Sequence, residues 1–321
     1  AYNRDPKGKS DVFIAKFDKN LATLIAATLI GGSQDECAYS MLFDPSGYLY
    51  IAGYTSSADF PTSEHAYDKK YNGGDGDAFV LKMDKDLTTL ESSTYLGGSG
   101  VENDWRSPEL VQDTDGNIYI AGITNSEDFP TTSGTFQEKY NGGTRDVFLS
   151  KFDPELRDLL ASTLLGGSND DRMGRSLCID FNNKNIYLGG YTFSPDFPTS
   201  ENSYSREVSG QLDGFVSKFS MDLKVLAAST ILSSGWIYCM MIHENGDIYV
   251  GGHAANRLPT TENAFYQGFD KAFDQGFISC FSNDLSGLKF STVIPGSYAE
   301  GGGRICSLNL GPSSDGHILS A

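Results

Sequence analysis

Acidic side chains recur at one position of a repeated pattern, and they are the residues with the most evident chemistry. They stand in three short stretches, at residues 34–36, 102–104 and 169–171. Carboxylates that a fold brings close together suit Ca²⁺, which takes about six to eight oxygen ligands. Two carboxylates in one cleft also suit the acid and base of a glycoside hydrolase. Because the acids recur at equivalent positions, we expect a structural or multivalent role rather than one asymmetric active site.

Aromatic residues beside the acids extend this candidate site. Trp105 and Trp236 fall outside the recurring words, so we expect them to contact a ligand rather than fill gaps in the fold. Aromatic rings stack on sugar faces while neighbouring polar groups bind hydroxyls, which is compatible with a glycan. The candidate binding residues are Asp35, Glu36, Glu102, Asp104, Trp105, Asp170, Asp171, Trp236 and Glu300.

The sequence contains no common catalytic motif. Its four histidines are scattered and form no HxH or HExxH pair, and no GxSxG nucleophile word is present. The segment 113–116 resembles the start of an EF-hand loop, but the twelfth position, which needs Glu, is Thr124. We therefore expect a protein that is not an enzyme and needs no cofactor, with calcium as the one cofactor left open.

Cysteine usage argues against a zinc ribbon or a dithiol redox site. The five cysteines include no CxxC pair, and their odd number leaves at least one unpaired within the chain. Most stand in apolar segments, where a buried and unreactive thiol is expected.

Charge and hydropathy exclude two classes of partner. The formal net charge is −18, with only 24 Lys and Arg. A nucleic-acid surface needs clustered basic residues, so neither nucleic acid nor an anionic membrane is expected to bind. The apolar segments are of strand length, far below the roughly 20 residues of a membrane span, so no direct membrane insertion is expected.

Internal repeats indicate which elements carry these residues. The word DAFVLKMD at 77–84 returns at 11–18, 146–153 and 213–220, and in altered form at 275–282. Each unit contains four short β-rich runs bounded by turn residues, such as 39–43, 48–53, 77–84 and 92–96. Four antiparallel strands per repeat are typical of a β-propeller blade.

The phase of the repeat predicts how a ring would close. Complete blades are expected at 38–98, 107–167, 175–233 and 237–295. The chain begins with the outer two strands of a blade (11–30) and ends with the inner two (304–321), which together make one more. We therefore expect an all-β, five-bladed β-propeller over residues 1–321 as a single domain. Because Ala1 falls within the pattern, the chain is also compatible with one module of a longer protein.

The word order in residues 77–132 resembles the SBBP β-propeller repeat of bacterial and archaeal surface proteins. The words are DAFV, STYLGGSG, GNIYIAG and DFPT, and the resemblance fades after about residue 230. It implies an extracellular or cell-surface setting and no defined reaction. The family name suggests seven blades, whereas this chain does not contain seven units.

Function is expected on the face that carries the long loops between the second and third strands of each blade, because binding residues concentrate on loops held by a rigid scaffold. We expect a binding or scaffolding module that associates with another surface protein or with itself. The alternatives are a lectin-like glycan binder and, less favoured, a glycan-cleaving enzyme using Asp104 or Asp171. The recurring lysines are expected to be structural, with amines reaching acids at blade seams, and so are the recurring loop aromatics. These residues are Lys16, Lys82, Lys151, Lys218, Phe60, Phe129, Tyr71 and Tyr140.

Overall fold

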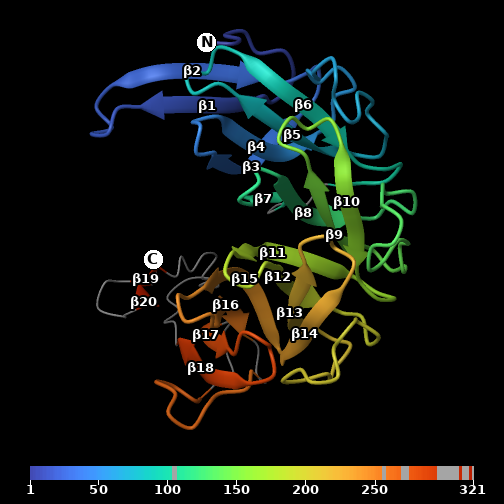
Figure 1. The fold of residues 1–321 in the computed structure, drawn as a ribbon, viewed down its shortest axis with the longest axis vertical. Coiled ribbons are helices and arrows are strands. Elements are labelled where there is room, and N and C mark those ends of the chain that lie inside the picture. The colour runs from blue at the N-terminus through green and yellow to red at the C-terminus, as the bar shows by residue number, and fades with distance from the viewer. Residues whose placement is uncertain (103–106, 255–257, 269–274, 295–310, 313–317, 320–321) are drawn as a thin grey trace. The chain divides into compact units, whose positions relative to one another are not determined.

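The computed structural model describes residues 1–102, 107–254, 258–268, 275–294, 311–312 and 318–319. Every regular element in these residues is a β-strand, which confirms the all-β class (Figure 1). In the same residues no helix is long and apolar enough to cross a membrane. The chain divides into two compact units: unit 1 is Ala1–Tyr140 with Phe148–Leu164, and unit 2 is Asn141–Val147 with Leu165–Ala321. The expectation of a single domain over residues 1–321 stays a prediction.

The first four-stranded sheet of unit 1 is an antiparallel meander. It contains β3 (Glu36–Phe43), β4 (Leu49–Thr55), β5 (Asp77–Met83) and β6 (Leu90–Leu96) in chain order. The expected strands are found, and β3 begins earlier than predicted, at Glu36. Gly53 is needed in β4, because a Cβ there would lie 2.0 Å from the carbonyl oxygen of Cys37 beside a bulge in β3.

The second sheet has the same strand order. It contains β7 (Glu109–Gln112), β8 (Ile118–Thr124), β9 (Asp146–Phe152) and β10 (Leu159–Leu165). The division between the two units passes through β9.

Unit 2 contains two further four-stranded meanders, which join through their first strands into one eight-stranded sheet. One consists of β11 (Asp171–Asp180), β12 (Asn185–Thr192), β13 (Asp213–Ser220) and β14 (Leu226–Ser233). The other consists of β15 (Gly235–Ile242), β16 (Ile248–Ala254), β17 (Gln275–Phe281) and β18 (Leu288–Ile294). The strands β11 and β15 are parallel neighbours at Arg175 and Cys239. Each of the four complete repeats expected from the sequence therefore forms four consecutive antiparallel strands.

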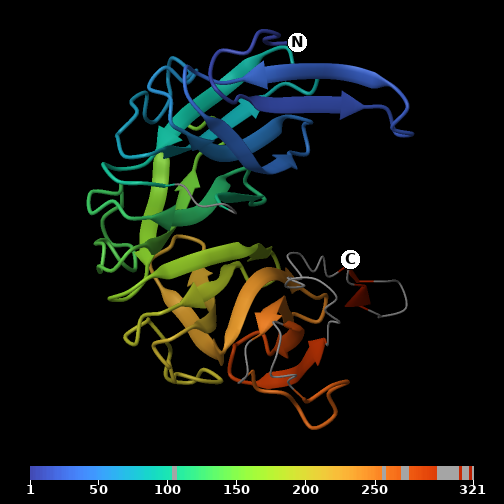
Figure 2. The same cartoon turned by 180° about the vertical axis from the view of Figure 1, so that it is seen from behind.

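The fifth blade is not assembled in the described residues. The hairpin of β1 (Val12–Phe17) and β2 (Leu24–Ile30) is a separate two-stranded sheet (Figure 2). The short pair β19 (Gly311–Pro312) and β20 (Ile318–Leu319) is another. Most of residues 304–321, which were expected to supply the inner two strands of this blade, lie outside the described residues. The all-β class and the four-stranded repeat are thus established, whereas ring closure is not.

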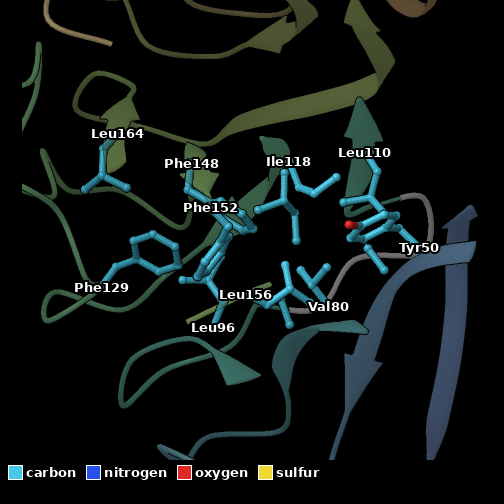
Figure 3. Close-up of a cluster of buried hydrophobic side chains, with 13 residues drawn as sticks. Tyr50, Val80, Leu96, Leu110, Ile118, Phe129, Phe148, Phe152, Leu156 and Leu164 are labelled. Carbon is cyan, nitrogen blue, oxygen red and sulfur yellow. The ribbon is translucent and has the colours of Figure 1, made fainter. Parts of the chain in front are cut away.

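Side chains of neighbouring sheets interlock to form the core. In unit 1, Tyr50 and Val80 of the first sheet meet Leu110, Ile118 and Phe148 of the second (Figure 3). In unit 2, an equivalent cluster joins Tyr187 and Val216 to Ile248 and Phe277. Since a sheet of four strands cannot bury both faces alone, the neighbouring repeats within each unit depend on one another for stability.

A leucine in the turn between the third and fourth strands also recurs. Leu87, Leu156, Leu223 and Leu285 all have positive φ values, of 56°, 56°, 59° and 60°, and all are buried. A non-glycine residue in this conformation is uncommon and costs free energy. Burial of the leucine side chain offsets that cost, because transferring such a side chain out of water is worth roughly 1.5–3 kcal/mol.

Candidate functional site

Three of the predicted binding acids lie inside the protein. Glu36, Glu102 and Asp171 are 3%, 0% and 0% exposed. Each occupies the same place in its repeat, at or just after the loop that follows the outer strand of the preceding sheet. Their carboxylates therefore face the chain rather than solvent.

Hydrogen bonds show what Glu102 does. Its carboxylate accepts the N–H of Gly98 (3.2 Å) and the hydroxyls of Thr124 (2.6 Å) and Ser126 (2.5 Å). This acid thereby joins the Gly-Gly turn after β6 to the end of β8. It connects two consecutive sheets of unit 1.

The other two acids repeat this arrangement. Glu36 accepts the N–H of Gly32 at 2.9 Å and the hydroxyl of Thr55 at 2.6 Å. Asp171 accepts the N–H of Gly167 at 2.7 Å and the hydroxyl of Ser194 at 2.8 Å. The expectation of a structural role for the recurring acids agrees with these contacts.

The pKa values of these acids follow from their burial. Burial raises the pKa of Glu102 to about 7, opposed by the hydrogen bonds from Ser126 and Thr124. Burial likewise raises the pKa of Asp171 to about 6. Neither behaves as an ordinary surface carboxylate.

Two other predicted acids are partly exposed and belong to polar clusters. Asp35 accepts the hydroxyl of Ser10 at 2.7 Å and lies 3.9 Å from the amine of Lys9. Oδ2 of Asp170 accepts a hydrogen bond of 2.7 Å from Nε of Arg172, and Nη1 of Arg145 lies 3.9 Å from Oδ1 of Asp170. Asp104, Trp105 and Glu300 fall outside the described residues, so their predicted roles stay predictions.

Trp236 is the predicted binding residue with the most distinctive surroundings. It is partly exposed at the start of β15, and its ring stacks on Tyr191 with 5.3 Å between centroids and 18° between planes. The rings of Tyr238 and His253 contact it edge-on, at 6.2 Å and 5.0 Å. Across the strands β11 and β12, Arg172 pairs with Tyr191. Unit 2 therefore presents an aromatic pair and an arginine together, which we call the Trp236 patch (Tyr191, Trp236 and Arg172).

The recurring aspartate of the DFPT word has a role that the sequence analysis missed. Asp59, Asp128 and Asp196 accept both the N–H and the hydroxyl of the serine in the Gly-Gly-Ser turn, at 2.7–2.9 Å. The backbone N–H of that serine is the main cause of the lowered pKa of each aspartate. The serine and the aspartate recur in the same repeats, and this joint recurrence was the signal available in the sequence.

The structural role expected for the recurring loop aromatics agrees with the packing. Phe60, Phe129 and Phe197 are buried and contact the phenylalanine of the third strand, with ring centroids 4.6, 4.7 and 4.5 Å apart. The ring of Tyr71 lies 6.3 Å from that of Tyr95. These rings hold each long loop against its own sheet.

The structure also contains an apolar cavity of about 480 Å³ in unit 1 that the sequence analysis did not predict. Its lining includes Phe13 and Phe17 of β1 and Met41 and Phe43 of β3. All four side chains are exposed, at 65%, 48%, 68% and 64%. These residues belong to the β1–β2 hairpin and to the neighbouring strand β3 of the first sheet.

Metal-binding groups were sought among the described residues. In that part of the chain, no three His, Cys, Asp or Glu side chains gather in a way that could hold a metal ion. Calcium binding stays an untested prediction.

Comparison with known proteins supports the repeat. Residues 27–61 match the SBBP family, described as a beta-propeller repeat, which confirms the resemblance found in the sequence. The regulatory protein FlaEY of Caulobacter vibrioides is 24% identical over 306 residues, which are 89% of this chain and 30% of that protein. The chain thus spans about a third of the length of this relative.

The solved structures that match this chain resemble it only weakly. The Dos1 propeller has a TM-score of 0.42 and 9% identity, covering 88% of this chain and 64% of that one. The xylan beta-1,4-xylosidase of Bacillus halodurans C-125 has a TM-score of 0.39 and 11% identity, covering 88% and 53%. At these scores the likenesses carry no argument about function.

Proposed function

We propose that this chain is a protein-association module of an extracellular or cell-surface protein and that its contact surface is the Trp236 patch. The stacked, partly exposed pair of Trp236 and Tyr191 beside Arg172 is the observation that carries the proposal. Tryptophan, tyrosine and arginine are the residues most enriched at the energetic centres of protein interfaces. The resemblance to a repeat of surface proteins supports the surface setting, and the similar Caulobacter protein is described as regulatory.

The buried acids also support association rather than catalysis. Asp171, one of the two acids considered for a glycan-cleaving site, is fully buried and accepts hydrogen bonds from Gly167 and Ser194. A general acid or base must reach its substrate within hydrogen-bonding distance. We therefore propose no reaction for this chain.

We further propose that the complete fold is the five-bladed ring expected from the repeat, closed when residues 304–321 supply two strands beside β1. The open edge of β1 supports this closure. In the described residues β1 pairs only with β2, so further strands would pair the N–H and C=O groups on its other edge. Deletion of residues 304–321 is expected to lower the melting temperature and increase binding of a hydrophobic dye. A deletion variant that matches the intact chain in both measurements would contradict ring closure.

The test of association compares Trp236→Ala with Phe265→Ala. Phe265 is an 84% exposed ring elsewhere in unit 2 and is a matched control for loss of an aromatic surface residue. Sedimentation equilibrium measures self-association, and quantitative copurification with a surface fraction of the source cells measures binding to another protein. We expect Trp236→Ala to weaken the association at least tenfold and Phe265→Ala to leave it unchanged. Equal behaviour of the two variants, or no association at all, would sink the proposal.

A glycan is the second candidate ligand, because the same half-exposed ring pair could stack on a sugar face. A glycan array probed with the intact chain, with and without calcium, distinguishes this alternative. Binding that is lost in Trp236→Ala would favour a lectin, whereas an array without binding would leave protein association as the function.

A further inference from the structure

Two buried carboxyl groups meet beside Gly97 in unit 1. Asp77 and Glu102 are both fully buried. A Cβ placed on Gly97 would lie 2.4 Å from Oε2 of Glu102 and 2.8 Å from Oδ1 of Asp77. The two oxygens therefore approach the same point, which only glycine leaves open.

The two acids differ in their hydrogen bonds. Both oxygens of Glu102 accept donated hydrogens, as expected for a carboxylate. Asp77 accepts the N–H of Asn72 through Oδ2 at 2.7 Å, while its Oδ1 has no partner in the described residues. A buried oxygen without a partner costs free energy, and a second buried anion beside the first costs more.

In the copy of the repeat that lacks the second acid, a backbone donor takes its place. In unit 2, Gly235 stands near the place of the second acid, and Oδ1 of Asp213 accepts the N–H of Ser234 at 3.1 Å. A hydrogen donor thus faces the strand aspartate in that copy. In the Asp77 copy the neighbour is a carboxyl group, which offers a hydrogen only if the pair is protonated.

We propose that Asp77 and Glu102 share one proton, which Oδ1 of Asp77 donates to Oε2 of Glu102, and that its loss loosens the loops around Gly97. The proton leaves to solvent, so the pair changes from one negative charge to two. Asp77 holds the β4–β5 loop through Asn72, and Glu102 holds the Gly-Gly turn and the end of β8. Repulsion between the two charges would act on all three segments at once. The proposal stands independently of the Trp236 patch.

The surroundings disfavour the doubly ionised pair. The groups acting on Asp77 and Glu102 from the β4–β5 loop and from the segment after β8 include Asp68 and Asp128, which are both acidic. In the described residues, neither carboxyl group forms an ion pair with a lysine or an arginine. Burial, with a further contribution from Glu102, raises the pKa of Asp77 to about 8. A bound proton therefore neutralises one of the two buried negative charges, which no lysine or arginine of the described residues does.

A bound metal ion is a weaker explanation for the same pair. Only these two acids converge here, and the described residues offer no third acidic, histidine or cysteine ligand. Calcium prefers about six to eight oxygens, and three of the acceptor sites of Glu102 are already used by N–H and O–H donors.

The test measures the unfolding equilibrium from pH 5 to about 9.5 in the intact chain, Asp77→Asn and Asp75→Asn. A raised folded-state pKa gives stability that is present at low pH and lost as the pH rises through the folded value, here about 8. For one proton the unfolding constant of the intact chain should rise by up to about tenfold per pH unit below that value. Asp77→Asn, whose amide donates a hydrogen permanently, should lose most of this dependence between pH 7 and 8. Asp75 is exposed and is the matched control, so Asp75→Asn should keep it.

Equal pH dependence in the intact chain and Asp77→Asn would overturn the proposal. Should Asp77→Asn not fold, carboxyl carbon NMR of the intact chain decides the question. One buried carboxyl titrating near neutral to alkaline pH supports the shared proton, and its absence refutes it. Stability that falls on chelation at constant pH would show that a cation occupies the site instead.

Discussion

Nζ of Lys82 donates a hydrogen bond of 2.7 Å to Oε1 of Glu155, and this ion pair joins β5 to the turn between β9 and β10. Its two ends differ in exposure, since the side chain of Lys82 is 7% exposed and that of Glu155 is 46% exposed. Burial lowers the pKa of Lys82, but its hydrogen bond to Glu155 and its contacts with Tyr50 outweigh that effect, so the pKa is raised. The ring of Tyr48 lies 4.5 Å from the same amine.

We expect Glu155→Ala to destabilise the protein more than Lys82→Met. Loss of Glu155 leaves a buried ammonium without its acid, which costs about 1–3 kcal/mol, whereas methionine keeps most of the lysine stem and removes the charge. Urea denaturation of both variants measures the difference. Greater destabilisation by Lys82→Met would mean that the amine is held by its aromatic contacts rather than by the acid.

The other recurring lysines have different partners. Lys16 lies 3.6 Å from Asp86, and Lys151 lies 3.1 Å from Asp113. Lys218 instead contacts the side-chain and main-chain oxygens of Asn283, at 3.0 Å and 3.3 Å. Lys16 and Lys82 thus reach an acid of the neighbouring sheet, as expected for a blade seam, whereas Lys151 reaches an acid of its own sheet and Lys218 an amide.

Phe129→Ala should destabilise the protein by about 3–4 kcal/mol, because it removes a buried ring and leaves a cavity beside Phe148. Phe136→Ala is the matched control, since this ring stands in the same loop and is 36% exposed. Thermal unfolding monitored by circular dichroism compares the two variants. A similar loss in both would indicate that the DFPT ring is not specifically packed.

The thiols are expected to react with a disulfide reagent at very different rates. Cys280 is buried, and burial raises its pKa to about 11, so little nucleophilic thiolate is present at pH 8. Cys37 is partly exposed. Peptide mapping after brief labelling should find Cys37 modified well before Cys280. The reverse order would show that β17 opens more readily than β3.

The sequence predicts the strands well because each is a short apolar run ended by turn residues, and because each word occurs several times. It predicts the candidate site less well. From the sequence alone, an acid in a loop is expected to face solvent and to be free to bind a ligand. Glu36 and Glu102 instead point inward, where each accepts a hydrogen bond from an N–H group of the adjacent Gly-Gly turn. The Trp236 patch combines residues from three strands, so only the packing of β11, β12 and β15 brings them together.

The loss of folding stability at acidic pH should depend on the aspartates of the DFPT words. The pKa of Asp128 is lowered, chiefly by a hydrogen bond from the backbone N–H of Ser99. The hydroxyl of Ser99 donates a second hydrogen bond to Asp128, at 2.9 Å. A lowered folded-state pKa gives stability that is present above the unfolded value, about 3.9, and is lost as the pH falls through the folded value. Asp128→Asn should therefore reduce the difference in stability between pH 6 and pH 3, while Asp115→Asn, in the β7–β8 turn, should not. Denaturation at the two pH values gives the comparison. If both variants lose stability in acid as the intact chain does, the turn after β6 is held by the serine's other contacts and not by the charge on Asp128.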